Sequence, residues 1–302
     1  MSDPTMSDPD RDGSAGHRAG FVAILGRPNA GKSTLLNALL GEKLAIVTDK
    51  PQTTRSRILG IKTLPGAQLL FVDTPGLHAS ERSFNAALND QAEEAAVDAD
   101  VALLLVDLTR GLDAGHAAWL ARWRERGAEV LVVGTKLDLP GARERDWPPE
   151  AAPDALRVSA RDGEGVAALQ EALVARLPLS PALYPEDDLS DRPLRFLVAE
   201  LVREAAFEQL EQELPYSLAV EVETYDESRP DVVRIRANLI VERASQKQIV
   251  IGRGGERIKA IGIQARRGIE ALIETRAHLE LWVKVEPKWT KKPARVKALG
   301  YV

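Results

Sequence analysis

The chain has 302 residues, of which 44% are hydrophobic, so it has room for about two domains with sizeable cores. It contains no cysteine, which excludes disulfide bonds and thiolate metal sites, and no apolar stretch approaches the ~20 residues that cross a bilayer. The net charge of −5 hides an asymmetry, because residues 231–302 hold 16 Lys and Arg against 7 Asp and Glu, whereas residues 1–230 hold 24 against 38. A basic end on an acidic body favours a polyanion contact at that end, with an ordinary solvated surface as the alternative.

The first segment, residues 1–19, is polar, rich in Asp, Gly and Ser, and carries the sequence MSDP twice. Its composition predicts a disordered leader, and it lacks the apolar stretch of a signal peptide. With the absence of cysteine, these features predict a cytoplasmic protein.

Residues 20–178 alternate apolar runs with amphipathic segments. Strands are predicted at 21–26, 58–63, 69–74, 101–107, 129–135 and 156–160, and helices at 32–41, 83–97, 115–126 and 165–177. Near-continuous apolar strands between helices indicate an α/β domain with a mostly parallel six-stranded sheet and helices on both faces. Ligands of such sheets bind at the carboxyl ends of the strands, which is where the motifs of this domain lie.

The segment GRPNAGKST follows the first strand and opens the first helix, and it matches the phosphate-binding pattern GxxxxGK[ST]. Its glycines let backbone N–H groups face the phosphates, its lysine reaches the β- and γ-phosphates, and its serine hydroxyl can bind Mg²⁺. The strand–loop–helix context disfavours the alternative of an ordinary glycine-rich turn. The predicted phosphate-binding residues are Gly26, Arg27, Pro28, Asn29, Ala30, Gly31, Lys32, Ser33 and Thr34.

The tetrapeptide DTPG, made of Asp73, Thr74, Pro75 and Gly76, ends the third predicted strand. Asp73 can bind Mg²⁺ through a water, and the Gly76 N–H can contact a γ-phosphate. At a strand end about 40 residues after a phosphate loop, this tetrapeptide is interpreted as a switch.

A second switch is predicted in QTTRSR, residues 52–57. A threonine in such a loop can close over Mg²⁺ when the γ-phosphate is present, and Thr53 and Thr54 both qualify. The alternative is a flexible basic loop.

A guanine-reading loop is predicted at the ends of the next two strands. The Asp138 carboxylate can accept hydrogen bonds from guanine N1–H and the N2 amine, a donor pair that adenine lacks. The stem of Lys136 can lie along the base, and the backbone N–H of Ala160, which follows Ser159, can meet guanine O6. A plain loop carboxylate is the alternative for Asp138, disfavoured by the two phosphate motifs upstream.

Thr135 stands where the usual guanine motif, Asn-Lys-x-Asp, has Asn. The Asn serves guanine N7 and ties the loop to the phosphate loop. Thr135 can donate one hydroxyl hydrogen bond but lacks the second donor of an amide, and a neutral hydrogen bond contributes about 0.5–1.5 kcal/mol. We therefore expect base choice to rest on Asp138 and nucleotide affinity to be several-fold weaker.

Residues 179–192 are rich in Pro and acidic residues and are interpreted as a linker. The remaining residues 193–302 predict a smaller α+β domain. Its pattern reads as a helix at 194–210, strands at 217–224 and 232–242, a helix at 245–251, a GRGG loop, a helix at 256–275 and a strand at 278–286.

The GRGG loop joins two helices, as in domains whose GxxG loop lets the backbone approach single-stranded RNA. A helix–turn–helix with a glycine corner is the alternative, and no recognition helix favours double-stranded DNA. The predicted RNA-binding residues are Lys247, Ile251, Gly252, Arg253, Gly254, Gly255, Arg257 and Lys259. The apolar side chains for an adjoining base groove, some of them core, are Ile249, Val250, Ile251, Ile258 and Ile261. The basic tail, residues 288–302, either extends this surface or packs back as a short helix.

These motifs, with the closing HLELWVKVEPKW and ALGYV, resemble the Era family of bacterial GTPases over residues 20–302. The resemblance implies a GTPase domain of the TRAFAC class followed by a type II KH domain. It implies binding of GTP, GDP and Mg²⁺, with the phosphate, switch, guanine and GxxG residues in the roles given above. It also implies binding to the 3′ end of small-subunit ribosomal RNA, assistance to small-subunit maturation, and peripheral contact with the inner face of the cell membrane. A monomer is the default expectation.

Hydrolysis is expected to be slow, because Leu77 follows DTPG where Ras-like enzymes carry a catalytic Gln. Asn29 resembles the asparagine that holds K⁺ in related GTPases, and such an ion could neutralise developing charge. Two rivals are a hydrolysis-impaired, nucleotide-gated RNA-binding scaffold, suggested by Thr135 and Leu77, and an ATP-dependent enzyme, which Asp138 disfavours.

Overall fold

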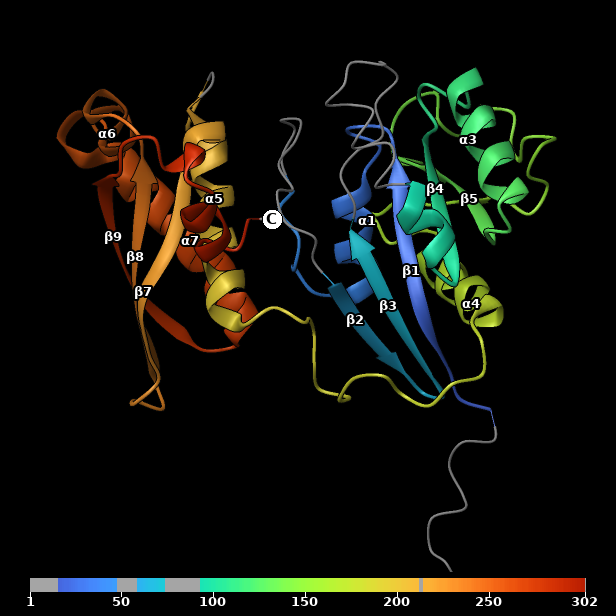
Figure 1. The fold of residues 1–302 in the computed structure, drawn as a ribbon, viewed down its shortest axis with the longest axis horizontal. Coiled ribbons are helices and arrows are strands. Elements are labelled where there is room, and N and C mark those ends of the chain that lie inside the picture. Colours follow the sequence, from blue (N-terminus) through green and yellow to red (C-terminus); the bar gives the residue numbers. More distant parts are fainter. Residues whose placement is uncertain (1–15, 48–58, 74–92, 212–213, 302) are drawn as a thin grey trace, which may run out of the picture. The chain divides into compact units, whose positions relative to one another are not determined.

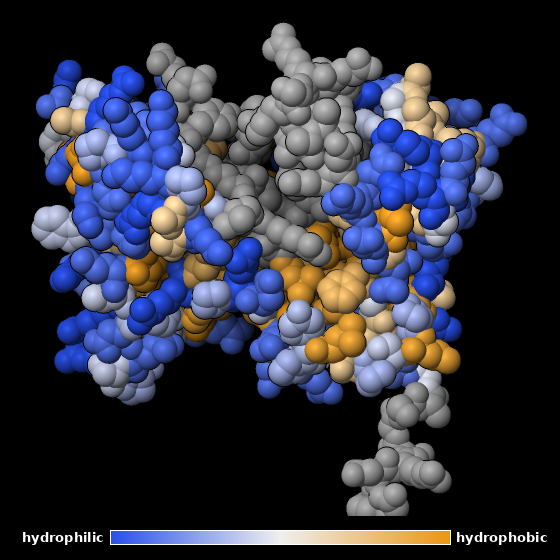
Figure 2. Space-filling model, viewed as in Figure 1, coloured by the Kyte–Doolittle hydropathy of each residue, from blue (hydrophilic) through white to orange (hydrophobic). Residues whose placement is uncertain are grey.

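The computed structural model describes residues 16–47, 59–73, 93–211 and 214–301 (Figure 1). The chain divides into two compact units, one formed by residues 1–30 and 59–189 and the other by residues 31–58 and 190–302. Among the helices in the described ranges, none has the length and apolarity to span a membrane. Hydrophilic side chains cover much of the visible face, with apolar ones in smaller patches (Figure 2).

The first unit is built on a six-stranded sheet. Its strands are β1 (Arg18–Gly26), β2 (Leu59–Leu64), β3 (Ala67–Asp73), β4 (Val101–Asp107), β5 (Val130–Thr135) and β6 (Leu156–Arg157). The strand order is β2-β3-β1-β4-β5-β6, and every neighbouring pair is parallel except β2 and β3. The predicted mostly parallel sheet is confirmed. Strand β6 is shorter than predicted because the backbone N–H of Ser159 bonds to Glu164 within the following loop.

Helices α3 (Ala114–Glu125) and α4 (Val166–Arg176) lie beside the sheet, close to their predicted bounds (Figure 1). Trp119 and Trp123 of α3 pack on inward side chains of β1, β4 and β5, and α4 contacts β3. Strand side chains alternate between the two faces, so near-continuous apolar strands can be buried on both. The helix predicted at 83–97 falls mostly outside the described residues, and residues 93–98 are helical.

The predicted linker is held against the edge of this sheet. Gln68 of β3 is fully buried, and its amide donates to Tyr184 O while its Oε1 accepts the N–H groups of Leu183 and Tyr184. The backbone N–H of Ile61, on edge strand β2, donates to Leu189 O at 2.9 Å. Residues 183–189 therefore behave as part of the first unit.

The second unit contains α1 (Lys32–Leu40), which begins after Gly31 in a left-handed conformation (φ 91°) and ends at Gly41. From residue 194 on, its elements are α5 (Leu194–Gln209), η1 (Pro215–Ser217), β7 (Ala219–Asp226), β8 (Val232–Val241), α6 (Ala244–Ile251), η2 (Arg253–Gly255), α7 (Glu256–Ile273), β9 (Arg276–Val285), η3 (Trp289–Lys291) and α8 (Pro293–Ala298). The sheet order is β7-β8-β9, with β7 antiparallel and β9 parallel to β8.

Helices α5 and α7 pack against this three-stranded sheet and enclose an apolar core. Beyond β9 the tail packs back as a short helix, which was one of its two predicted alternatives. Trp289, Leu299 and Tyr301 cover Ala219 and Ile240 on the other face of the sheet. Arg295 of α8 also forms two 2.8 Å hydrogen bonds to Glu221 and two of 2.9 Å to Glu286.

Candidate nucleotide site and RNA-binding surface

The phosphate loop begins where β1 ends. Gly26 adopts a φ of 154°, and a Cβ there would lie 2.9 Å from the carbonyl oxygen of Leu105, so the position requires glycine. Asn29 is exposed and has a φ of 61°, a left-handed conformation that Asn tolerates. Gly31 then allows the turn into α1, whose first two residues are Lys32 and Ser33. This backbone fits the cradle of N–H groups expected for phosphate and Mg²⁺ binding.

Arg27 of this loop is braced by helix α3. Its Nη2 lies 2.7 Å from Asp113 Oδ2, and its guanidinium lies 5.2 Å from the centre of the Trp119 ring. Asp113 is the N-cap of α3 and accepts the backbone N–H of His116 at 3.0 Å. Burial raises the pKa of Asp113, but hydrogen bonds from Arg27 and His116 outweigh burial and hold this pKa well below its ordinary value. The carboxylate thus stays charged and fixes Arg27.

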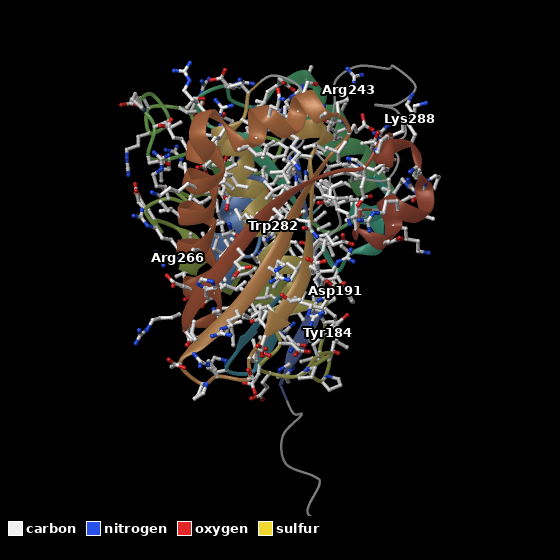
Figure 3. The ribbon with its side chains drawn as sticks, turned by 90° about the vertical axis from the view of Figure 1, so that its left-hand side faces the viewer. Tyr184, Asp191, Arg243, Arg266, Trp282 and Lys288 are labelled. Carbon is white, nitrogen blue, oxygen red and sulfur yellow. The ribbon has the colours of Figure 1, made fainter. Side chains whose placement is uncertain are left out.

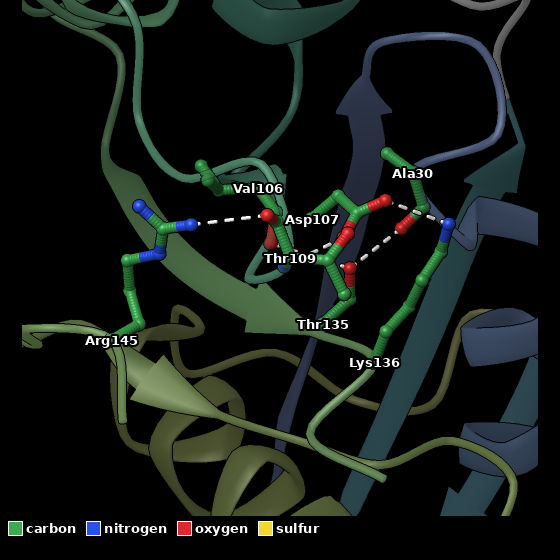
Figure 4. Close-up of polar contacts among 7 residues, drawn as sticks. All are labelled: Ala30, Val106, Asp107, Thr109, Thr135, Lys136 and Arg145. Carbon is green, nitrogen blue, oxygen red and sulfur yellow. Dashed lines mark hydrogen bonds and ion pairs between the residues drawn. The ribbon is translucent and has the colours of Figure 1, made fainter. Parts of the chain in front are cut away.

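Thr135 lies at the end of β5 and is only 2% exposed. Its hydroxyl donates to the backbone carbonyl of Ala30, with an Oγ1–O distance of 2.7 Å, and lies 3.3 Å from Val106 O (Figure 4). The threonine therefore ties the end of β5 directly to the phosphate loop.

Lys136 follows in a left-handed conformation (φ 62°), and its Nζ lies 2.8 Å from Asp107 Oδ2 at the end of β4 (Figure 4). Burial raises the pKa of Asp107, but hydrogen bonds from Lys136 and Thr109 outweigh burial and lower the pKa below its ordinary value. Arg145 fixes the loop after β4 by donating to the carbonyl oxygens of Leu108 and Thr109, each at 3.0 Å.

Asp138 and Ser159 come together, as the sequence predicts. The Ser159 hydroxyl donates to Asp138 Oδ1 at 3.0 Å and accepts the backbone N–H of Asp162. Asp138 has a 15% exposed side chain, and Ala160, next to Ser159, is half-buried. On the other side, the exposed Arg161 places Nη1 3.9 Å from Asp138 Oδ2. The carboxylate is therefore oriented by the Ser159 hydroxyl and retains lone pairs that can accept further hydrogen bonds.

Of the predicted switch residues, only Asp73 lies within the described ranges. Asp73 is the last residue of β3 and pairs in register with Ile24 of β1. The predicted residues outside the described ranges are Thr53, Thr54, Thr74, Pro75, Gly76 and Leu77.

The GRGG loop lies between α6 and α7, as predicted. Gly252, Gly254 and Gly255 have φ values of 76°, 60° and 83°. No heavy atom lies within 4 Å of a Cβ built on Gly254 or Gly255, so the backbone there is open to a close ligand. Arg253 is exposed beside them.

The basic side chains around the loop are not all free of other contacts. Arg257 and Lys259 on α7 are exposed, whereas Lys247 and Ile251 on α6 are half-buried. Arg257 also donates to Ile249 O at 3.0 Å, which holds its guanidinium near the end of α6.

A groove of about 360 Å³ runs between α7 and β9. Among the predicted groove residues, Ile258 lines it, Ile249 is 47% exposed, and Val250 and Ile261 are fully buried core. The lining residues are Ile258, Lys259, Gly262, Ile263, Arg266, Ala277, His278, Leu279 and Leu281. Figure 3 looks onto this unit, with Arg266 labelled on α7 and Trp282 on β9.

Sequence reasoning missed several residues of both sites. The β9 wall of the groove could have been predicted from HLELW. In this segment polar residues and the exposed Trp282 alternate with apolar residues that face inward. Asp107 and Asp113 carry no comparable signal, because their partners are distant in sequence.

Two family models match the chain. One, described as a 50S ribosome-binding GTPase, matches residues 21–136, and the other, described as a KH domain, matches residues 213–290. Together they indicate a P-loop GTPase fold followed by a KH fold.

Full-length relatives match closely. GTPase Era of Geotalea uraniireducens is 45% identical over 291 residues, covering 94% of this chain and 98% of the relative. GTPase Era of Pseudomonas aeruginosa is 43% identical over 307 residues, covering 98% and 99%.

Solved structures agree in fold. A variant of Aquifex aeolicus Era bound to GDP·AlF4⁻ has a TM-score of 0.81 at 36% identity, covering 94% of this chain and 99% of that one. Era in complex with MgGDPNP and nucleotides 1506–1542 of 16S ribosomal RNA gives the same TM-score and identity, covering 95% and 99%. The chain therefore belongs to the GTPase Era family, a family of GTP hydrolases with a KH domain.

Proposed function

We propose that this protein is a GTP-hydrolysing switch that binds the 3′ end of small-subunit ribosomal RNA and assists maturation of the small ribosomal subunit. The observation that carries the proposal is the presence, in one chain, of a tied guanine-type loop and an open GxxG loop beside a groove. The Era structure with MgGDPNP and 16S ribosomal RNA, 36% identical, supports both ligands.

In the nucleotide site, the backbone from Gly26 to Thr34 would hold the phosphates, and Lys32 would reach the β- and γ-phosphates. Ser33, one threonine of QTTR, and Asp73 through a water would bind Mg²⁺. This ion neutralises charge on the β- and γ-phosphates when bound. Thr74, Pro75 and Gly76 would complete the γ-phosphate switch, and Asp138 with the Ala160 N–H would read guanine.

A potassium ion at Asn29 is the proposed substitute for an arginine finger. This assignment is supported by the place of Asn29 in the phosphate loop and by its exposure. Hydrolysis should then be faster in K⁺ than in Na⁺ at equal ionic strength. Asn29→Ala should abolish this difference, whereas equal rates for the unmodified protein in the two salts would contradict the proposal.

On the RNA side, we propose that Gly252 to Gly255 approach the sugar–phosphate backbone while bases enter the groove between α7 and β9. Arg253, Lys259 and Arg266, all exposed, would supply charge to phosphates. We propose that the same RNA-binding surface includes Lys247, Ile251 and Arg257.

The sequence predicted a leader at 1–19, a GTPase domain at 20–178, a linker at 179–192 and a KH domain at 193–302. We further propose to widen the GTPase domain, so that it includes β1 from Arg18 and the docked residues 183–189, and to keep the KH domain at 193–302. The proposed location is the cytoplasm, where the ribosomal partner is assembled. Peripheral contact with the inner face of the cell membrane and a monomeric state stay predictions.

The test is turnover of GTP and of ATP by the purified full chain, with and without an oligonucleotide of the ribosomal RNA 3′ end. Turnover of GTP alone, with RNA binding tighter in GTP than in GDP, supports a coupled switch, since linkage makes the coupling reciprocal. RNA binding without turnover would favour the scaffold, and ATP turnover would favour an ATP-dependent enzyme. A matched control oligonucleotide with the same composition in scrambled order tests whether the RNA is read by sequence.

A further inference from the structure

Thr135 occupies the position from which the usual asparagine serves two partners, the phosphate loop and guanine N7. In this chain, the hydroxyl of Thr135 lies 2.7 Å from the carbonyl oxygen of Ala30 and 3.3 Å from that of Val106. Both neighbours are carbonyl oxygens, which only accept hydrogen bonds, so the hydroxyl must be the donor.

A hydroxyl carries a single hydrogen, and that of Thr135 is used by the Ala30 carbonyl. Guanine N7 is also an acceptor only. The hydroxyl therefore cannot donate to N7 while it holds the phosphate loop. The NH₂ group of an asparagine has two hydrogens and could do both.

Contacts to the other edge of the base do not depend on Thr135. Asp138 is oriented by the Ser159 hydroxyl at 3.0 Å, and the half-buried Ala160 follows Ser159 in the chain. N1–H and the N2 amine of guanine lie on the Watson–Crick edge, away from N7. O6 belongs to that edge too but neighbours N7, and its proposed donor is the backbone N–H of Ala160, not Thr135.

We propose that this protein reads guanine through its Watson–Crick edge alone and accepts guanine nucleotides whether or not they carry N7. Thr135 keeps the structural half of the asparagine's role, the tie to the phosphate loop, and has lost the recognition half. The ligand class this implies includes 7-deazaguanine nucleotides. The inference rests on the proposed guanine site and makes it more specific.

The experiment compares binding of GDP and 7-deaza-GDP to the full chain by calorimetry. The two affinities should agree within about twofold in the unmodified protein. Thr135→Asn should favour GDP over 7-deaza-GDP by roughly 2- to 10-fold, the range of one neutral hydrogen bond. Inosine diphosphate, which lacks the N2 amine, should bind both proteins more weakly than GDP.

Thr135→Val removes the hydroxyl at nearly constant shape. It should weaken GDP and 7-deaza-GDP equally, since only the tie to Ala30 is lost. Discrimination against 7-deaza-GDP by the unmodified protein, removed by Thr135→Val, would overturn the inference while leaving the guanine site intact. Binding of neither GDP nor 7-deaza-GDP would instead contradict the proposed function.

Discussion

Arg27 Nη2 of the phosphate loop lies 2.7 Å from Asp113 Oδ2 at the start of α3, and the guanidinium lies 5.2 Å from the centre of the Trp119 ring. The loop that is proposed to hold phosphates is thus braced from outside the nucleotide motifs. Because a phosphate cradle depends on backbone geometry, the brace should influence nucleotide binding without touching the nucleotide.

Asp113→Asn tests this brace, since asparagine still caps a helix but carries no charge for Arg27. GDP affinity should fall roughly two- to fivefold, as expected for a partly exposed ion pair, while thermal stability changes little. The measurement is calorimetric titration with GDP. Glu164→Gln breaks the exposed Arg143–Glu164 pair in the same unit and should leave affinity unchanged. Equal losses in both variants would argue against a specific brace.

His116 should make the first unit sensitive to mild acid. Burial lowers the pKa of His116 below its ordinary value of 6.5, although Asp113 raises it, and Arg27 lowers it further. The folded state then binds fewer protons than the unfolded state. The contribution of neutral His116 to the free energy of unfolding is therefore complete above pH 6.5, and it declines as the pH falls towards the lowered pKa. The slope in that window is at most about 1.4 kcal/mol per pH unit.

Urea unfolding at pH 7.5 and pH 5.5 measures the effect, with His116→Gln as the comparison. The variant should lose less stability than the unmodified protein between these two pH values. An identical pH response of the two proteins would remove His116 as the source. The depressed pKa of Asp113 does not interfere, because that carboxylate stays ionised throughout this range.

Asp138→Asn should move base preference from guanine to xanthine nucleotides. The carboxylate is aligned by Ser159 and can accept from N1–H and N2, whereas xanthine presents a carbonyl at C2 that pairs with an amide donor. GTP affinity should fall roughly 10- to 100-fold, the range for hydrogen bonds to a charged group. Competition between GTP and xanthosine triphosphate measures the change. Asp162→Asn, an exposed carboxylate in the next loop, is the matched control and should not alter preference.

Gly254→Ala should weaken RNA binding more than it weakens the fold. Its φ of 60° makes any Cβ strained by about 1–2 kcal/mol, and the surrounding space is open to a phosphate backbone. Affinity for the ribosomal RNA oligonucleotide should fall roughly tenfold through loss of a charge-assisted contact. The matched control is Gly66→Ala in the β2–β3 turn, where the site is also open and φ is 76°. It should lose stability through the same backbone strain but keep its affinity for RNA. Fluorescence anisotropy with labelled RNA compares the two.

Arg295→Lys should loosen the C-terminal helix. The guanidinium bonds both oxygens of Glu221 and of Glu286, and a lysine cannot form these paired contacts. Since the three side chains are 21–34% exposed, solvent screening limits the expected loss to about 1–2 kcal/mol of unfolding free energy. Arg236→Lys, facing Glu280 on the exposed face of the same sheet, should cost less than about 0.5 kcal/mol. Equal losses on urea unfolding would contradict the paired-contact explanation.

Sequence patterns predicted the elements and motif positions because these depend on local requirements. A positive φ at Gly26 or Gly252 favours glycine whatever surrounds it, and near-continuous apolar strands need both faces covered. The GxxG loop and the helices around it were found in this way.

The partners of individual side chains could not be predicted in the same way. Thr135 and Ala30 are 105 positions apart, and Lys136 reaches Asp107 only because β4 and β5 are neighbours in the sheet. Whether the Thr135 hydroxyl donates to guanine N7 or to the Ala30 carbonyl depends on this contact, which the sequence does not show. Gln68 looked like an ordinary polar strand residue, yet its amide is buried beneath the segment that composition identified as a linker.

This docking of residues 183–189 bears on how the protein can be divided for experiments. A truncation at residue 178 would strip Gln68 of its bonds to Leu183 and Tyr184 and leave the Ile61 N–H without the Leu189 carbonyl. It would uncover a buried amide and an edge strand, and open edges template association between chains. A fragment of the first unit should therefore extend through residue 189 to remain soluble and monomeric, and one ending at residue 178 should aggregate.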